Sequence, residues 1–435
     1  MKSEKNYLSI IQWLVYLLAN SIAIPIVIGD IFQLSGDEIS TLMQRVFFIV
    51  GLSSLIQAIF GHRYPIADGP AGSWVSIFVI YASIGIQQGK PVVETLQILE
   101  AGLLISGLIL FLLGITKWVR YVIFLFTPIV TGIFLFILAV QLSWVFLNGM
   151  VSSANSEVQI NMNSILPSLL VFFLIIFFIT KGKGWLKNYA ILIGILFGWV
   201  LFSILGEGRI SLSTSDELIK LPKLFAWGFP DFNGSIMITA ILFTFLLISN
   251  TVAAISSAEE TIANQKGLFQ ERLYSSTWVG GVSHLLSTMF SSIGVVPLPA
   301  TAGFVKLTKQ YRMFPFLFAC VTLIVISVFP SIVGLLASLP LPVASAALLA
   351  TLIEMYGIAL RSLTKQRLNK RNMSIIGLSV LVGIGTMFLP EDFFSGLPSV
   401  IQYICSNGLL MGTFIAVFLE LLLKNNKTLV EKIHE

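Results

Sequence analysis

The sequence predicts an all-α protein that crosses a lipid bilayer many times. Of its 435 residues, 56% are hydrophobic and only 11% are charged, and the mean hydropathy is +0.92. Because so small a polar fraction cannot cover a soluble chain of this length, lipid must be the solvent for most of the surface. Apolar runs of about 20 residues, the length of a membrane-spanning helix, recur along the whole chain.

Fourteen such segments are predicted between the polar breaks. They cover approximately residues 8–29, 40–60, 64–86, 92–115, 119–146, 164–180, 186–205, 235–257, 274–293, 297–305, 313–336, 340–360, 373–389 and 397–423. Two of them are predicted to be interrupted. Segment 64–86 contains Pro65, Asp68, Gly69, Pro70 and Gly72, and segment 297–305 is too short to cross as a regular helix.

The basic residues predict the orientation. With the N-terminus in the cytoplasm, 21 of the 26 basic residues fall on the cytoplasmic side. The five on the other side are Arg45, Lys90, Arg209, Lys220 and Lys223. Cytoplasmic loops carry an excess of Lys and Arg, so this pattern favours an even number of crossings with both termini inside. No removable signal peptide is expected before the first segment.

The chain divides into two halves at the polar loop 206–234, with seven segments on each side. The interrupted segment is third in each half, and a Thr-Pro motif at 127–132 and a Pro-Val motif at 341–346 each open a fifth segment. Seven is odd, so the second half must be inverted relative to the first. Paired breaks in inverted repeats predict a binding site near the bilayer midplane, where the N–H groups of half-helices meet a polar or anionic ligand.

Motifs along most of the chain resemble those of one transporter family. They are Gln12-Trp13 followed by Ala23-Ile24-Pro25, the Gly- and Ser-containing run from Pro65 to Ser76, Phe126 to Gly132, and Pro340 to Val343. In this order and spacing they resemble the nucleobase-ascorbate transporter family, the xanthine and uracil permeases.

The resemblance implies both a fold and a function. It implies fourteen segments as two inverted repeats, with a core domain at 1–115 and 235–336, a gate domain at 116–206 and 337–423, and short strands in the third and tenth segments beside the substrate. The implied function is a secondary active permease for purines or for uracil- and xanthine-type bases, coupled to protons as is the default in the family and working by alternating access. A homodimer through the gate domain and a bacterial inner-membrane location are implied as well.

The sequence departs from the family where the base is bound. Bacterial members place a glutamate in the eighth segment and a glutamate or glutamine in the tenth, and these positions match Asn250 and Ala300 here. An aromatic residue of uracil-type members matches Gly72, and a histidine matches Ala254.

The candidate substrate-binding residues lie in the first, third, eighth and tenth segments. They are Asn20, Gly72, Ser73, Trp74, Asn250, Thr251, Leu298, Ala300 and Thr301. The amide of Asn250 offers both a donor and an acceptor to the edge of a base, although a hydrogen bond between helices is the alternative.

Two carboxylates are candidates for proton coupling. Asp68 lies in an interrupted segment, where an ionisable side chain is costly and its presence therefore suggests a function. The alternative is a side chain near the cytoplasmic mouth, five residues from Arg63, that is simply solvated or paired. Glu100 lies inside the fourth segment and has the same two interpretations, with a further option of facing an outer vestibule. His284 is expected to pack rather than to relay protons.

Other classes of function receive less support. The three histidines are far apart and the two cysteines lack metal-ligand spacing, so no enzyme, metal site or cofactor is predicted. No phosphate-binding Gly-x-x-x-x-Gly-Lys loop indicates a nucleotide-driven pump, and a bilayer rather than nucleic acid accounts for the net charge of +5. A carrier of another small organic or inorganic anion on the same fold, and a sensor or partner subunit without transport, stay open as alternatives.

Overall fold

The structure is a computed structural model. It describes residues 2–124, 127–151, 162–183, 185–205, 217–262, 268–394, 397 and 399–423. Phe126 of the Thr-Pro motif, residues 206–216 of the predicted polar loop and the C-terminal residues 424–435 lie outside these ranges.

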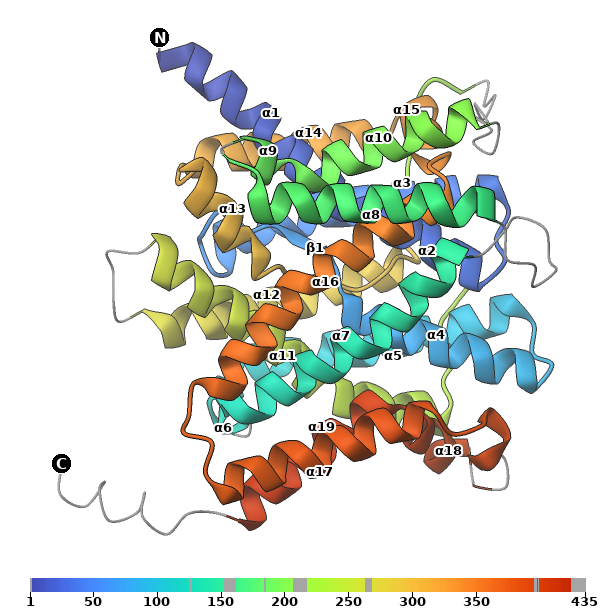
Figure 1. Ribbon diagram of the computed structural model, residues 1–435, viewed down its shortest axis with the longest axis vertical. Coiled ribbons are helices and arrows are strands. Elements are labelled where there is room, and N and C mark those ends of the chain that lie inside the picture. The colour runs from blue at the N-terminus through green and yellow to red at the C-terminus, as the bar shows by residue number, and fades with distance from the viewer. Residues whose placement is uncertain are drawn as a thin grey trace. The chain divides into compact units, whose positions relative to one another are not determined.

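The described chain is built almost entirely of helices (Figure 1). In the first half they are α1 (Lys2–Ser21), α2 (Ala23–Ile31), α3 (Gly36–Phe60), α4 (Gly72–Gln87), α5 (Val92–Ile115), α6 (Val119–Ile123), α7 (Pro128–Val151), α8 (Met162–Lys181), α9 (Trp185–Asn188) and α10 (Ala190–Ile204). In the second half they are α11 (Gly234–Ile262), α12 (Phe269–Met289), α13 (Ala300–Thr308), α14 (Met313–Ser327), α15 (Pro330–Ala337), α16 (Leu341–Thr364), α17 (Lys370–Met387), the 3₁₀ turn η1 (Glu391–Phe394), α18 (Ser399–Ser406) and α19 (Gly408–Leu422).

Within the described ranges, seven helical stretches are long and apolar enough to cross a bilayer, judged by length and composition. An eighth arises if α14 and α15, which are bent by 92° at their junction, count as one span. Most of the remaining predicted segments are broken or shorter, while α12 is a continuous helix of 21 residues that is too polar to meet the same criterion. Segment 64–86 becomes a strand followed by α4, and segment 397–423 becomes α18 and α19. Apolar length alone therefore located the segments, but local breaks decided which of them are continuous helices.

The chain forms two compact units. One contains residues 1–119 and 142–353, and the other contains residues 120–141 and 354–435. In the larger unit α5 packs along α12, and α3 packs on α14. Glycines permit the first contact, because a Cβ atom on Gly114 would lie 2.3 Å from the backbone nitrogen of Trp278. Small residues at close helix contacts are typical of membrane bundles.

The two interrupted segments pair with each other through short strands. β1 (Asp68–Pro70) and β2 (Val295–Pro297) are antiparallel, with Asp68 opposite Pro297 and Pro70 opposite Val295. The ladder continues beyond the strands, since the Leu298 amide donates to Ala67 O (2.9 Å) and the Ala71 amide donates to Gly294 O (2.9 Å). These bonds satisfy backbone groups that a helix would otherwise satisfy, which is the condition for irregular backbone inside a membrane protein.

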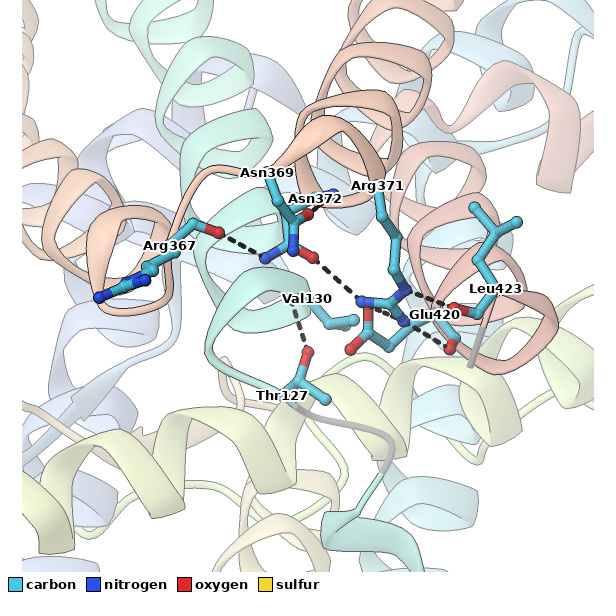
Figure 2. Close-up of polar contacts among 8 residues, drawn as sticks. All are labelled: Thr127, Val130, Arg367, Asn369, Arg371, Asn372, Glu420 and Leu423. Atoms are coloured by element: carbon cyan, nitrogen blue, oxygen red, sulfur yellow. Dashed lines mark hydrogen bonds and ion pairs between the residues drawn. The ribbon is translucent and has the colours of Figure 1, made fainter. Parts of the chain in front are cut away.

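In the smaller unit, α17 lies beside α19, and Arg371 joins the start of one to the end of the other (Figure 2). Its guanidinium donates to the carbonyl oxygens of Leu423 and Glu420 (3.0 Å for the latter) and forms an ion pair of 3.1 Å with the Glu420 carboxylate. A cationic side chain at a helix C-terminus pairs with carbonyl groups that have no partner within the helix. Arg371 thus caps α19.

Candidate functional site

The antiparallel ladder brings predicted residues of both interrupted segments to one place. Asp68 belongs to β1, while Gly72, Ser73 and Trp74 begin α4 directly after it. Ala300 and Thr301 begin α13 directly after β2. Because β1 and β2 are antiparallel, the two helices leave the ladder from opposite ends. Each therefore presents its N-terminus beside the paired strands.

The start of α4 carries unused hydrogen-bonding groups. Ala71 at its N-cap position makes no side-chain cap, so the first-turn N–H groups lack that partner. The Ser73 hydroxyl is buried, with 1% of the residue exposed, and has no hydrogen-bond partner among the described residues. A Cβ on Gly72 would meet only the Leu142 side chain, at 3.0 Å. This helix start combines small side chains with free donors, which suits a polar or anionic ligand.

Asp68 is buried and linked to serines of two helices. Only 1% of the residue is exposed, and among the described residues its carboxylate makes no ion pair with Arg63, so the solvated alternative is wrong. The Ser53 hydroxyl donates to Asp68 Oδ2 and also lies 2.6 Å from Ser283 Oγ. Oδ1 has no partner in the described part of the chain.

The serine chain from Asp68 can run in two directions. A hydroxyl donates a single proton, so Ser53 points either to the carboxylate or to Ser283. If Asp68 carries a proton, it can donate to Ser53, Ser53 to Ser283, and Ser283 to Val279 O, 3.1 Å away. If Asp68 is ionised, Ser53 turns toward it instead. The protonation of Asp68 therefore reorients hydrogen bonds as far as α12.

The Trp74 side chain is fixed by a hydrogen bond to His284 and by packing against Phe243. Its Nε1–H donates to His284 Nε2 (3.0 Å), and His284 Nδ1 lies 2.8 Å from Gly280 O. A carbonyl only accepts, so these partners assign the neutral imidazole with the proton on Nδ1. Phe243 packs on the indole with ring centroids 4.8 Å apart. Trp74 is fully buried, and His284 fixes its orientation.

The remaining predicted residues differ in whether their side-chain polar groups already have hydrogen-bond partners within the protein. The Asn20 amide donates to Tyr16 O (2.8 Å) and the Thr251 hydroxyl donates to Leu247 O (3.3 Å), each within its own helix. The Asn250 side chain makes no hydrogen bond to any described residue, and α11, which carries it, packs on β2 and α13. Of these three residues, Asn250 is the one whose side chain has no hydrogen-bond partner among the described residues.

In the tenth segment, Thr301 contacts α1 and Leu298 contacts β1. Thr301 Oγ1 accepts a hydrogen bond of 3.3 Å from the Tyr16 hydroxyl, which ties α1 to α13. The Leu298 side chain covers Gly69, where a Cβ would lie 2.7 Å from Leu298 Cδ1. Ala300, in the place of the family's glutamate or glutamine, contributes no polar side chain.

Glu100 lies apart from the serine chain. Its carboxylate is fully buried, and both Ser291 and Arg45 of α3 interact with it. The structure thus separates the two coupling candidates: Asp68 belongs to the strand site, and Glu100 belongs with Arg45.

Sequence reasoning missed the partners Ser53, Ser283 and Tyr16. Ser53 and Ser54 form a polar pair within the apolar stretch of α3, a signal like the one that drew attention to Asn250. Their roles depend on contacts across the fold, such as the Asp68 amide donating to Ser54 Oγ at 2.9 Å.

Comparison with known proteins gives one consistent family. The sequence model of the Permease family matches residues 5–392. A Bacillus subtilis (strain 168) protein named "Putative purine permease YwdJ" is 34% identical over 422 residues, which cover 95% of this chain and 94% of that protein. The xanthine permease of the same organism is 26% identical, over 94% of this chain and 92% of its own length. The uric acid permease PucK, also from Bacillus subtilis, is 24% identical over 96% of each chain.

Solved structures support the fold alone. The transmembrane domain of the cyanobacterial bicarbonate transporter BicA matches with a TM-score of 0.66 at 14% identity, covering 92% of this chain and 97% of that one. The murine anion transporter Slc26a9 matches with a TM-score of 0.59 at 12% identity, over 95% of this chain and 68% of that one. The family model and the relatives, all named permeases, show that this multi-pass membrane protein belongs to the Permease family of xanthine and uracil permeases, the nucleobase-ascorbate transporters.

Proposed function

We propose that this protein carries a nucleobase, of the purine or the uracil and xanthine type, across the bacterial inner membrane in symport with a proton. The observation that carries the proposal is the β1–β2 pairing, which brings the free polar groups of the third segment beside the tenth segment. The purine, xanthine and uric acid permeases among its relatives favour a purine as substrate.

The site offers a base three kinds of contact. Free N–H groups at the start of α4 and the unpartnered Ser73 hydroxyl suit the carbonyl oxygens of an oxopurine. The Asn250 amide can donate to one atom of the base edge and accept from its neighbour. Leu298 and Trp74 would form the apolar walls, with Thr301 and Ala300 beside them, while Asn20 and Thr251 would complete the lining from α1 and α11.

Transport itself would follow the alternating-access scheme. Fourteen segments in two inverted repeats would form a core domain (1–115 and 235–336) that moves against a gate domain (116–206 and 337–423), with both termini in the cytoplasm. The positive-inside pattern supports this topology, and the paired strands at corresponding positions of the two halves support the repeat. Two copies would pair through their gate domains.

Asp68 would be the coupling site. It is buried, one of its oxygens is unpartnered in the described chain, and its serine chain can reverse when a proton binds. It would thereby replace the glutamates that this sequence lacks at Asn250 and Ala300. Glu100 is the second candidate for this role.

The test is uptake of radiolabelled uracil, xanthine, guanine, adenine, hypoxanthine and urate by cells without their own permeases, with and without a protonophore. The variant is Asp68→Asn, the matched control is Asp37→Asn at the exposed start of α3, and Glu100→Gln tests the second candidate. We expect saturable uptake of at least one base that collapses with the protonophore and with Asp68→Asn but persists with Asp37→Asn.

Two results would redirect the assignment. Uptake that survives both the protonophore and Asp68→Asn would make the protein a uniporter, whereas uptake that collapses with the protonophore but survives Asp68→Asn would move coupling to Glu100. Absence of uptake for every base, with the protein inserted in the membrane, would reject nucleobase transport. A screen of small anions would then follow, because the uncapped start of α4 also suits an anion.

A further inference from the structure

A cavity lies in the larger unit, away from the strand site. It has a volume of about 400 Å³ and is bounded by the turn between α2 and α3, the first half of α3, the start of α5 and the segment 220–227. None of its lining residues belongs to β1, α4, β2 or α13. Its size is within the range of small-molecule sites. In the predicted topology it opens on the side away from the cytoplasm.

The inner part of the cavity places a buried arginine beside aromatic rings. Arg45 is only 4% exposed, its Nε has no hydrogen-bond partner among the described residues, and its guanidinium lies 5.4 Å from the Trp227 ring. Phe32 and Leu96, both buried, complete the apolar lining. Glu100 acts on Arg45 electrostatically, but no ion pair joins them within the described chain.

A buried arginine whose Nε–H has no acceptor is suited to bind a ligand that supplies one. Burying a donor without an acceptor costs free energy that a bound acceptor would restore. The planar guanidinium matches two adjacent oxygens or a ring oxygen and nitrogen, and it stacks well with flat rings. The neighbouring indole offers a second flat surface to the same ligand.

The mouth of the cavity is basic. Lys220 and Lys223 line it and are exposed, and neither makes an ion pair with a described residue. The acidic lining residue is Glu38, whose carboxylate already accepts from the Ser35 amide (2.8 Å) and hydroxyl (2.7 Å). Three positive charges against one engaged negative charge attract anions to the opening.

The segment that carries the lysines is held in place by its backbone. The side-chain amide of Gln44 donates to the backbone carbonyl of Lys220 (2.5 Å), and the side-chain amide of Gln97 donates to the backbone carbonyl of Trp227 (2.9 Å). The backbone N–H of Trp227 donates to Ser291 Oγ (3.2 Å). A wall held by three bonds from different elements needs little ordering when a ligand arrives. The cavity is thus a formed site.

We propose that this cavity is a second substrate site, an outer vestibule that binds a flat anionic oxopurine, of which urate is the simplest example, before it reaches the strand site. Arg45 holds the ring oxygens, Trp227 stacks on the ring, and the two lysines attract the charge. This inference rests on the proposed nucleobase transport, which it deepens by favouring anionic over neutral bases.

The test compares urate with neutral hypoxanthine in uptake assays of the full chain. The variant replaces both lysines, Lys220→Gln with Lys223→Gln, and the control is Lys90→Gln, a basic residue of the same predicted side outside the cavity. We expect the double variant to raise KM for urate about three- to tenfold at low salt, with kcat unchanged. The effect should shrink with added salt, and hypoxanthine and the control should show no change.

Equilibrium binding of radiolabelled urate to purified protein separates the two proposals. If the wild type transports no base, nucleobase transport fails, yet urate binding that weakens in Arg45→Gln and in the double lysine variant would still support the cavity. Unchanged urate affinity in the double variant, or an equal change for hypoxanthine, would overturn the vestibule even where uptake is normal. The exposed lysines keep the test decisive if Arg45→Gln does not fold.

Discussion

The Trp74 indole donates its Nε1–H to Nε2 of His284, 210 positions later in the chain, across 3.0 Å. This bond ties the first turn of α4 to α12 and positions the large aromatic side chain next to Ser73. His284, which sequence reasoning assigned to packing, therefore packs by a specific polar contact that fixes an expected wall of the site.

Replacing His284 with leucine should leave the Trp74 N–H buried without an acceptor. We expect a loss of about 1–3 kcal/mol in stability, because an unpaired buried donor retains its desolvation cost. His284→Gln, whose side-chain carbonyl can accept, should lose less. Thermal unfolding of the detergent-solubilised protein measures both, and equal losses for the two variants would argue against the hydrogen bond as the cause.

Ser53→Ala should impair proton coupling more than binding of the base. The change removes the donor to Asp68 and the link to Ser283. A hydrogen bond to a charged group is worth about 1.5–3 kcal/mol, so net uptake should fall about tenfold or more. Exchange of labelled for unlabelled base should continue, because it needs no net proton movement.

The neighbouring Ser54→Ala is the control for this experiment. Ser54 accepts from the Asp68 amide, not from its carboxylate, at 2.9 Å. Net uptake that drops equally in both variants would indicate a structural effect on β1 and would count against the serine chain.

Gly114→Ala should force α5 and α12 apart. The added methyl group would lie 2.3 Å from the Trp278 backbone nitrogen, and backbone atoms cannot move aside as a side-chain end can. We expect a destabilisation of about 1–3 kcal/mol, typical of overpacking. Gly377→Ala in α17 has no atom within 4 Å and should be neutral or stabilising by up to about 1 kcal/mol. Thermal melts of the two variants that do not differ would reject this packing.

Arg371→Gln should loosen the contact between α17 and α19. It removes the ion pair with Glu420 and the donors to the last carbonyl groups of α19 (Figure 2). We expect a loss of about 1–3 kcal/mol, and Arg371→Lys should recover only part of it, since an ammonium group lacks the fork that reaches several oxygens. Limited proteolysis near residue 423 reports the change, with exposed Lys370→Gln as control; equal cleavage in both would contradict the capping role.

Several features of this protein follow from local sequence. Composition and the length of apolar runs are properties of consecutive residues. The membrane class and the approximate places of the helical segments could therefore be predicted without knowing any tertiary contact. Pro65, Gly69, Pro70 and Gly72 disfavour a regular helix through their own backbone preferences, which is why the break before α4 was predictable. The motifs that indicated the family are also short and local, and the family match confirms them.

Other features depend on tertiary packing. Asp68 meets Ser283 through Ser53, and these two serines are 230 positions apart, so no periodicity relates them. Packing decided that Asn250 keeps its amide unused while Asn20 bonds within its own helix. It also buried Arg45 beside Trp227 in a cavity that the sequence did not indicate. The physical reason is that apolar length and backbone breaks act on neighbouring residues, whereas the partner of a buried polar group is whichever side chain the folded helices place opposite it.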